Sequence, residues 1–299
     1  MQKNERYMTD NFPKMSFVGL DGILVQFSQK ICENGNSAAL AFRQEIEKKN
    51  HPYIIESSNS LTAAYFRIDI KIAAADSILN FFDDVLKEKN WYTSQLPSNR
   101  KLFTIPCVFG TDLAPQFEKV IKLAKLSRAQ AISEFTRTKT RVMTIGFSPG
   151  QPYAGLLSEK WDIPRLAEVS KNVPQSALVC AIRQLIIFSN STPTGWHHIG
   201  QTAFECFNSN RQQPILLNPG DEITFLEINP SELAQIKSNN SDVLGGVKIS
   251  EIRTSYVGSG VDFRVFLLSR HGKKWLSISG TIKVWCSRLL CNGRGRGSA

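Results

Sequence analysis

The sequence predicts an α+β protein, with a small α/β domain followed by a compact β-barrel or sandwich. Up to about residue 92 the expected elements follow the order β-α-β-β-α, which is similar to a split βαβ unit. From residue 141 to 228, short strands are separated by Gly and Pro, and closely spaced strands of this kind are typical of barrels and sandwiches. The length of 299 residues is compatible with two domains.

The N-terminal elements are predicted from apolar periodicity. We expect a polar leader over 1–15 and an α/β domain over 16–92. Its expected elements are a strand at 17–27, a helix at 34–49, strands at 53–56 and 61–70 joined by the turn SSNS, and a helix at 76–89. The polar stretch TSQLPSNRK, residues 93–101, is the expected linker.

The second domain is predicted over 102–230. Helices are expected at 112–124 and 127–136, with Asp112 and Ser127 as N-caps. The expected strands are SALVCAI, LIIFS, GWHHIG, AFECF and EITFLEI. The segment NPGD, ending at Asp221, supplies the turn before the final strand.

The net charge of +10 is concentrated near the C-terminus. From Val247 onward there are ten Lys/Arg and two acidic residues, a net +8, so the first 246 residues carry only +2. A basic face built into the fold is therefore not expected, and only the tail could act as a nucleic-acid arm. We predict no nucleic-acid partner.

The hydropathy pattern predicts a soluble cytoplasmic protein without a membrane partner. Mean hydropathy is -0.18, and no apolar run approaches the roughly 20 residues that a membrane span needs. The start MQKNERYMTDNFPK also lacks the apolar segment of a signal peptide.

Cysteines and histidines do not indicate a metal. The six cysteines are scattered without a C-x-x-C pair, which favours reduced, mostly buried thiols. His197 and His198 are adjacent on an expected strand, where their side chains point to opposite faces. We therefore predict one inward and one outward histidine and no metal site.

The stretch GFSPG, residues 146–150, matches the G-x-S-x-G pattern of a serine-hydrolase nucleophile motif but lacks the backbone features that the motif needs. In that motif the residue after the serine donates its backbone N–H to an oxyanion and begins a helix. Here that residue is Pro149, which has no N–H, and Gly150 and Pro152 oppose a helix. A serine nucleophile is therefore rejected. The sequence also has no P-loop, so we expect any ATP to be bound by another polypeptide and no cofactor to be bound by this chain.

The ordered segments IPCVFGTDLAPQFEKV, TIGFSPGQPYAGLL, IPRL, NVPQSAL, STPTGWHHIGQT and LNPGDEITF resemble the carboxyltransferase C/D-domain family. The resemblance covers about Ser16 to Ile228 and rests on GF-x-PG-x-PY together with GW-x-x-IG-x-T. It implies a small α/β N-terminal domain followed by a cyclophilin-like β-barrel.

The resemblance also implies a function. We expect a B-type subunit of an ATP-dependent 5-oxoprolinase, inactive alone, that opens the lactam of 5-oxoproline with a C-type (KipA-like) and an A-type subunit. One alternative is a non-catalytic KipI-like inhibitor that binds a sensor histidine kinase. Others are a subunit of the allophanate hydrolase or urea amidolyase type, and a degenerate paralogue without activity.

Candidate substrate-binding residues follow from the family motifs. They are Gly146, Phe147, Pro149, Gly150, Tyr153, Arg165, Gln184 and Trp196. Arg165 can grip a carboxylate, with a surface or structural arginine as the alternative. Gln184 suits an amide, Tyr153 can donate to a ligand oxygen, and Trp196 can form a platform; packing in the core is the alternative for each. The resemblance identifies no catalytic residue.

Several residues depart from the family pattern. Phe135 replaces a usual histidine, Gln151 an aromatic residue and Gln201 an arginine, while a stretch that is normally rich in glycine holds Ile182, Arg183 and Ile186. Bulky residues in place of glycine fill space near the backbone, so weakened activity is one expectation.

Residues 231–299 are expected to form a basic tail. Arg270–Leu276 and Trp285–Arg294 have codons that, read one nucleotide later, can spell motifs of the C-type subunit. We therefore interpret the tail as a frameshifted remnant of a fused C-type subunit.

Overall fold

The computed structural model describes residues 12–72, 74–239, 244–252, 265–268 and 275–278. Residues up to 253 belong to one compact unit and the remainder to another. The second unit contains the antiparallel hairpin of β15 (Val265–Leu268) and β16 (Trp275–Ile278). Among the described residues, no helix combines the length and apolar character needed to cross a bilayer.

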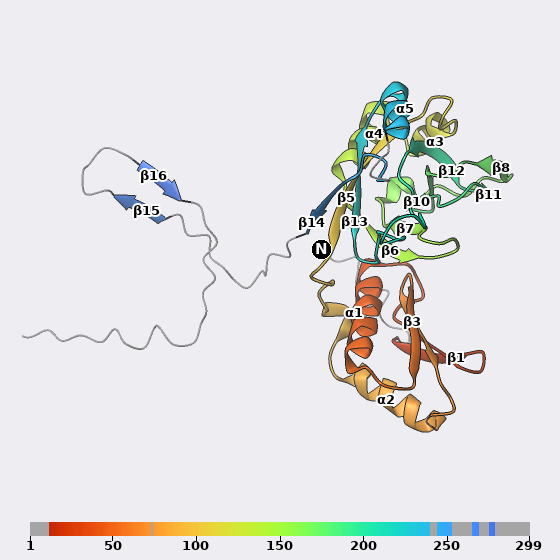
Figure 1. Cartoon of the computed structure of the whole chain (residues 1–299), viewed down its shortest axis with the longest axis vertical. Helices are drawn as coiled ribbons and strands as arrows, with labels where there is room; N and C mark the ends of the chain where they lie inside the picture. The colour runs from red at the N-terminus through yellow and green to blue at the C-terminus, as the bar shows by residue number, and fades with distance from the viewer. Residues whose placement is uncertain (1–11, 73, 240–243, 253–264, 269–274, 279–299) are drawn as a thin grey trace, which may run out of the picture. The chain divides into compact units, whose positions relative to one another are not determined.

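The N-terminal domain is a four-stranded antiparallel sheet with both helices on one face (Figure 1). The strands follow the spatial order β1-β2-β4-β3. The elements are β1 (Lys14–Val18), β2 (Gly22–Gln26), α1 (Glu33–Lys49), β3 (Ile54–Ser60), β4 (Ala63–Ile68) and α2 (Ala75–Lys87). Phe42, Phe66 and Phe82 are fully buried between sheet and helices. Their burial supplies much of the hydrophobic stabilisation of this domain.

Two predicted features of this domain are wrong. The strand expected at 17–27 is a hairpin, because Gly19 adopts φ 66° and turns the chain between β1 and β2. The expected turn SSNS lies inside β3, and the chain turns at Leu61, which has φ 53°. The expected leader ends within β1, and residues 1–11 lie outside the described part.

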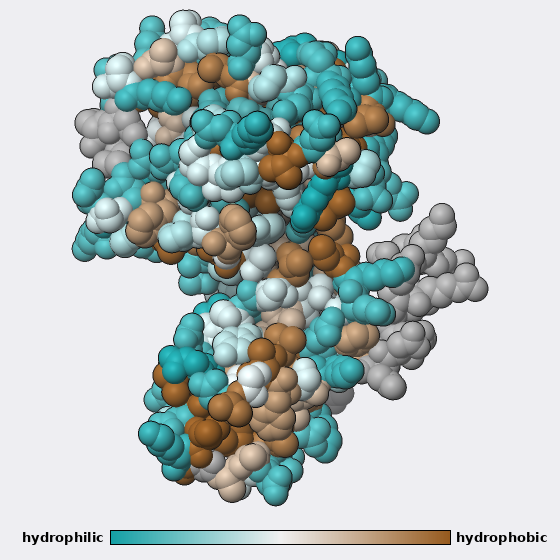
Figure 2. All heavy atoms as spheres, turned by 90° about the vertical axis from the view of Figure 1, so that its right-hand side faces the viewer, coloured by the Kyte–Doolittle hydropathy of each residue, from teal (hydrophilic) through white to brown (hydrophobic). Residues whose placement is uncertain are grey.

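The N-terminal sheet has exposed apolar side chains at one end. This end combines the β1–β2 turn, the residues after β4 and the start of β3, which the strand register brings together. Its exposed apolar residues are Phe17, Val18, Leu20, Ile55, Ile70 and Ile72. Figure 2 shows apolar surface gathered on this lower domain.

The second domain is a closed barrel of seven strands, as the cyclophilin-like prediction requires. The strands follow the order β12-β9-β10-β7-β6-β13-β5, and β12 pairs with β5 to close the ring. The strands are β5 (Lys101–Phe109), β6 (Thr140–Ile145), β7 (Pro152–Gly155), β9 (Ala177–Ala181), β10 (Gln184–Ile187), β12 (His197–Thr202) and β13 (Glu222–Glu227). The strands β8 (Ser170–Val173) and β11 (Thr192–Thr194) pair in a separate two-stranded antiparallel sheet.

Helices α3 (Phe117–Leu123) and α4 (Arg128–Arg137) contribute to the barrel core. Ser127 caps α4 in a capping box with Gln130, which confirms its predicted role. The cap predicted at Asp112 is wrong, because a turn held by Ala114 N–H to Thr111 O delays the start of α3.

The C-terminal part of the barrel domain also differs from expectation. The segment AFECF forms no strand; Phe207 makes only an isolated bridge to Ile215. Beyond residue 230, α5 (Pro230–Ser238) packs on the barrel, and β14 (Lys248–Glu251) pairs with β5. Part of the expected tail therefore belongs to this domain. The stretches that suggest a frameshift lie largely outside the described residues.

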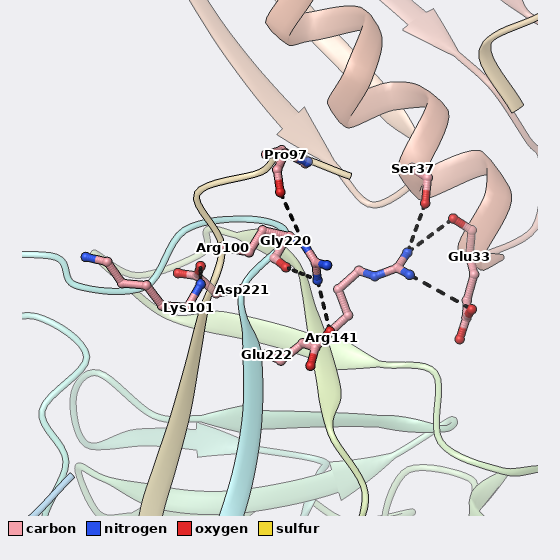
Figure 3. Close-up of polar contacts among 9 residues, drawn as sticks. All are labelled: Glu33, Ser37, Pro97, Arg100, Lys101, Arg141, Gly220, Asp221 and Glu222. Atoms are coloured by element: carbon pink, nitrogen blue, oxygen red, sulfur yellow. Dashed lines mark hydrogen bonds and ion pairs between the residues drawn. The ribbon is translucent and has the colours of Figure 1, made fainter. Parts of the chain in front are cut away.

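The two domains meet where β6 passes the first turn of α1. Asn36 is fully buried and donates to Leu61 O at 2.6 Å and to Met143 O at 2.9 Å. Arg141 reaches from β6 to Ser37 Oγ at 3.1 Å, and Glu33 lies beside it (Figure 3). These contacts join segments more than 100 residues apart.

Candidate functional site

The sheet of the barrel divides its side chains between two clusters. On β9 and β10, Leu178, Cys180, Leu185 and Ile187 point into the barrel core. The alternating residues point outward and form a second cluster with residues of β7 and β8 and with Trp196, which immediately precedes β12. We call this second set the outer-face cluster. Its members are Val173, Ala177, Val179, Ala181, Ile186, Phe188 and Trp196, with Tyr153 packed against them.

Three of the predicted site residues come together on this cluster. The Tyr153 and Trp196 rings lie edge to face, with centroids 6.3 Å apart. The Arg165 guanidinium stacks on Trp196, 5.3 Å from the ring centroid. Arg165 is exposed and makes no hydrogen bond or ion pair with any described residue. Its charge is therefore available to an anion, and the aromatic ring holds the guanidinium in place.

Gln184 faces the same side of the sheet. It is paired with Gly155 on β7 and with Ala181 on β9. Its side chain is 2% exposed, and Nε2 finds no partner among the described residues. A buried amide donor without an acceptor is costly, and a carbonyl oxygen is the group that would satisfy it.

The glycine-rich loop 146–150 joins β6 to β7 and forms a tight turn. Gly146 N–H donates to Gln151 O, and Gln151 N–H donates to Ser148 O, both at 3.1 Å. Gly150 adopts φ 71°, and a Cβ there would clash with Cys206 O. The chain then enters a strand at Pro152, which confirms the rejection of a serine nucleophile.

The remaining loop residues do not join the Arg165–Trp196 stack. Phe147 is 79% exposed at the tip of the loop. No hydrogen bond or ring contact of the described residues links Gly146, Phe147, Pro149 or Gly150 to Tyr153, Arg165 or Trp196. The predicted site therefore divides into an aromatic and arginine part and a separate loop.

The departures from the family pattern also lie at different places. Phe135 is buried in the barrel core, 4.4 Å from Trp161 and 5.5 Å from Phe109 between ring centroids. It does not belong to the outer-face cluster. Ile186 does belong to it, and Gln151 and Gln201 are buried. Gln201 donates to Gln175 O at 3.0 Å.

Both histidines of GWHHIG are buried, and they lie on opposite faces of β12 as predicted: His197 is opposite Cys180 of the barrel core and His198 opposite Val179 of the outer-face cluster. His197 Nε2 lies 2.9 Å from Pro164 O. His198 lies opposite Val179, and burial lowers its pKa. The outward side is covered because Val173, from the two-stranded sheet of β8 and β11, packs on this face. Sequence reasoning left His198 out of the site, although its two-residue spacing from Trp196 places both on one strand face.

The described cysteines form no disulfide. Cys107, Cys180 and Cys206 are fully buried, and burial raises the pKa of the Cys180 thiol to about 12. Cys286 and Cys291 lie outside the described residues. Within the described part, no three His, Cys, Asp or Glu residues are grouped to hold a metal ion.

Two cavities lie beside α5 rather than at the outer-face cluster. One, of about 490 Å³, is lined by Pro106, Ile228 and Ile236 among others. The other, of about 430 Å³, lies near Leu113 and Leu233.

Comparison with known proteins agrees with this architecture. The family described as carboxyltransferase domain, subdomain C and D, matches residues 13–217. The B-type subunit of 5-oxoprolinase from Bacillus subtilis (strain 168) is 26% identical over 231 residues, which cover 75% of this chain and 96% of that protein. The corresponding 5-oxoprolinase protein of Escherichia coli O157:H7 is 32% identical over 146 residues, or 48% of this chain and 67% of that protein.

Solved structures show the same fold. The Kluyveromyces lactis urea amidolyase matches with a TM-score of 0.63 and 16% identity, over 80% of this chain and 16% of that chain. The urea carboxylase of the same yeast matches with a TM-score of 0.62 and 17% identity, over 80% of this chain and 24% of that chain. The similarity at this level of identity concerns the fold alone.

Proposed function

Because the chain belongs to the family of the carboxyltransferase domain, subdomain C and D, we propose that it is a B-type subunit of an ATP-dependent 5-oxoprolinase. The relatives named as B-type subunits of 5-oxoprolinase support this assignment, and one of them is matched over 96% of its length. We further propose that the chain acts in the cytoplasm, binds no cofactor itself and is inactive alone.

The observation that carries the proposal is Arg165, which stacks on Trp196 and has no ion pair among the described residues. 5-Oxoproline has a carboxylate and a lactam carbonyl. A guanidinium held against an aromatic ring suits the carboxylate because it can donate to both oxygens. Gln184, with its unpaired Nε2, suits the carbonyl.

The chemistry itself calls for further subunits. A lactam carbonyl is a poor electrophile, and phosphorylation or strong polarisation is needed before water can add. Since the sequence has no P-loop, we assign ATP to a partner. We propose C-type and A-type partner subunits. The exposed apolar end of the N-terminal sheet is the kind of surface that subunits bury.

The test is co-expression with C-type and A-type subunits and an assay for ATP-dependent release of glutamate from 5-oxoproline. We expect turnover only with all three chains. Arg165→Ala should lower kcat/KM at least about tenfold. Arg137→Ala is the matched control, because Arg137 is also exposed and without an ion pair among the described residues. A stable assembly without turnover that Phe135→His does not restore would contradict the proposal.

A second candidate function is supported by Phe135. The position that usually carries a histidine is filled here by a ring stacked in the barrel core. A proton-handling group is thus absent at this described position, which suits a non-catalytic, KipI-like protein that binds a sensor histidine kinase. Binding of a kinase by the chain without any 5-oxoprolinase activity of the assembly would favour this candidate. The allophanate hydrolase or urea amidolyase type remains a third proposal, and allophanate should be included in the same assay.

A further inference from the structure

The rings of Tyr153 and Trp196 contact each other over the outer face of β9 and β10. Tyr153 lies on β7 and Trp196 immediately precedes β12, and β10 and β9 lie between these two strands. Neighbouring strands are about 4.8 Å apart, so the two backbones are separated by about 14 Å. The ring centroids are nevertheless only 6.3 Å apart. Both side chains must therefore lean over the floor formed by β10 and β9.

That floor is narrow and shaped by small residues. On β9 the outward residues are Ala177, Val179 and Ala181. On β10, Gln184 leans toward Gly155, where an added Cβ would lie 3.4 Å from Gln184 Cγ and 3.3 Å from Arg183 O. Because Gly155 has no side chain, the space beside Gln184 stays open.

The polar group on this floor is incompletely satisfied. Gln184 is 2% exposed and Trp196 6% exposed, so water has little access to either. Gln184 Nε2 has no acceptor among the described residues. Buried donors in folded proteins are nearly always paired, and an unpaired one therefore points to a missing acceptor.

We propose that Tyr153 and Trp196 close a buried carbonyl subsite whose donor is Gln184 Nε2. Arg165, stacked on the same Trp196 ring, receives the carboxylate of the ligand, and entry of the ligand displaces the Trp196 ring. The inference rests on the proposed function and specifies the substrate class: a small molecule that carries both a carboxylate and an amide carbonyl. A carboxylate alone engages only Arg165 and leaves the ring pair closed.

The proposal is tested by tryptophan fluorescence of the full chain. The probes are 5-oxoproline, which has both groups, acetate, which has only the carboxylate, and 2-pyrrolidinone, which has only the lactam. We expect a saturable change with 5-oxoproline that Trp196→Phe abolishes, because the chain contains four other tryptophans that should not respond. Acetate and 2-pyrrolidinone should bind at least about tenfold more weakly, since each lacks one of the two contacts.

Two variants test the donor itself. Gln184→Met keeps the length of the side chain and removes the amide, and should weaken 5-oxoproline binding about tenfold while leaving acetate unchanged. Gly155→Ala should have the same effect with Gln184 intact, because the new Cβ would lie 3.3 Å from Arg183 O, a tight contact, and would fill the space beside Gln184 Cγ at 3.4 Å. Arg137→Ala is the control and should bind as the wild type. Circular dichroism of each variant verifies folding.

The outcomes separate this inference from the proposed function. Absence of a saturable response in the full chain, or binding of 5-oxoproline by Gln184→Met and Gly155→Ala that is as tight as that of the wild type, overturns the subsite. If the three-subunit assembly still turns over 5-oxoproline, the proposed function survives that result. Conversely, a Gln184-dependent response without turnover by the assembly supports the subsite and contradicts the enzymatic role.

Discussion

Ile182 and Arg183 form the two-residue turn between β9 and β10 in the left-handed region. Their φ angles are 43° and 62°. Ala181 and Gln184 pair on either side, so the turn resembles the primed hairpin turns that favour Asn and Gly. The turn is held by Arg183, whose N–H donates to Trp161 O and whose Nε donates to Leu157 O. A β-branched residue at positive φ is strained. These hydrogen bonds therefore hold the backbone of Ile182 in a conformation that isoleucine disfavours.

Ile182→Asn is therefore expected to stabilise the protein. Asn tolerates positive φ, and relief of the strain should raise the free energy of unfolding by about 1 kcal/mol. Urea unfolding measures this change. Ile249→Asn is the matched control, because Ile249 is 40% exposed against 37% for Ile182 but lies in β14. There Asn should lower stability. A loss of stability in Ile182→Asn equal to that of the control would contradict the account.

His198 gives the stability a pH dependence. Burial lowers its pKa below the usual 6.5. As pH falls, the unfolded chain takes up the proton before the folded one, so this contribution is complete above about 6.5 and is lost below it. We expect Tm to fall between pH 7.5 and 5.5 and His198→Gln to reduce that slope. An unchanged slope in the variant would assign the pH dependence to other groups.

Residue roles are predictable from sequence only where the backbone decides them. Pro149 has no N–H to donate wherever it lies, so a serine nucleophile at Ser148 can be rejected without coordinates. The lack of a partner for Gln184 Nε2 within the described part of the chain and the burial of His198 depend instead on which segments cover this face of the sheet. Neither periodicity nor composition contains that information.

At the scale of elements, the turn before β13 is hydrogen-bonded to the start of β5. Asp221 is buried, and its two carboxylate oxygens accept from Lys101 N–H at 2.7 Å and Asn218 N–H at 2.8 Å. Burial raises its pKa, although these hydrogen bonds oppose the rise. The sequence NPGD thus closes a turn and also aligns two parallel strands.

Asp221→Ala should destabilise the barrel. It leaves two backbone N–H groups without their acceptor, at a cost of about 1 to 3 kcal/mol. Thermal unfolding followed by circular dichroism measures the loss. Asp112→Ala is the control, because Asp112 is exposed and not a helix cap. A loss no larger than that of the control would show that other contacts align β5 and β13.

Element boundaries are predictable where local signals are strong. The helix 127–136 begins at Ser127 because Ser127 and Gln130 form a capping box, a signal written in four residues. The hairpin of β1 and β2 is predicted as one strand, because apolar residues continue through Phe17–Phe27 and mask the turn at Gly19. The segment AFECF has strand composition, but β12 and β14 already pair with β5.

At the scale of the whole molecule, Asn36 links the two domains. Its amide donates to carbonyls of Leu61 and Met143, one in each domain, and its side chain is fully buried. Two domains with separate cores are thus connected by polar contacts, and Thr144 Oγ1, which donates to Asn59 O at 2.7 Å, adds a second buried one. Buried hydrogen bonds at this junction fix the position of α1 against β6 more specifically than apolar packing alone would.

Asn36→Ala should cost about 2 to 3 kcal/mol of unfolding free energy, because two buried carbonyls lose their donor. Urea unfolding followed by intrinsic fluorescence measures it. Ser37→Ala is the matched control in the same helical turn, since it removes only one partly exposed contact with Arg141. A smaller loss for Asn36→Ala than for Ser37→Ala would contradict this role.

The parallel pairing of β5 with β13 constrains synthesis of the protein. Lys101 and Asp221, which meet at the start of this pair, are 120 residues apart in the chain. The N-terminal sheet pairs residues close in sequence and is complete once Ile68 has been made. The barrel cannot close on a ribosome until Glu227 has emerged, so one edge of β5 stays open while about 120 further residues are made. Such late closure exposes the nascent chain to aggregation and makes it a natural client for chaperones.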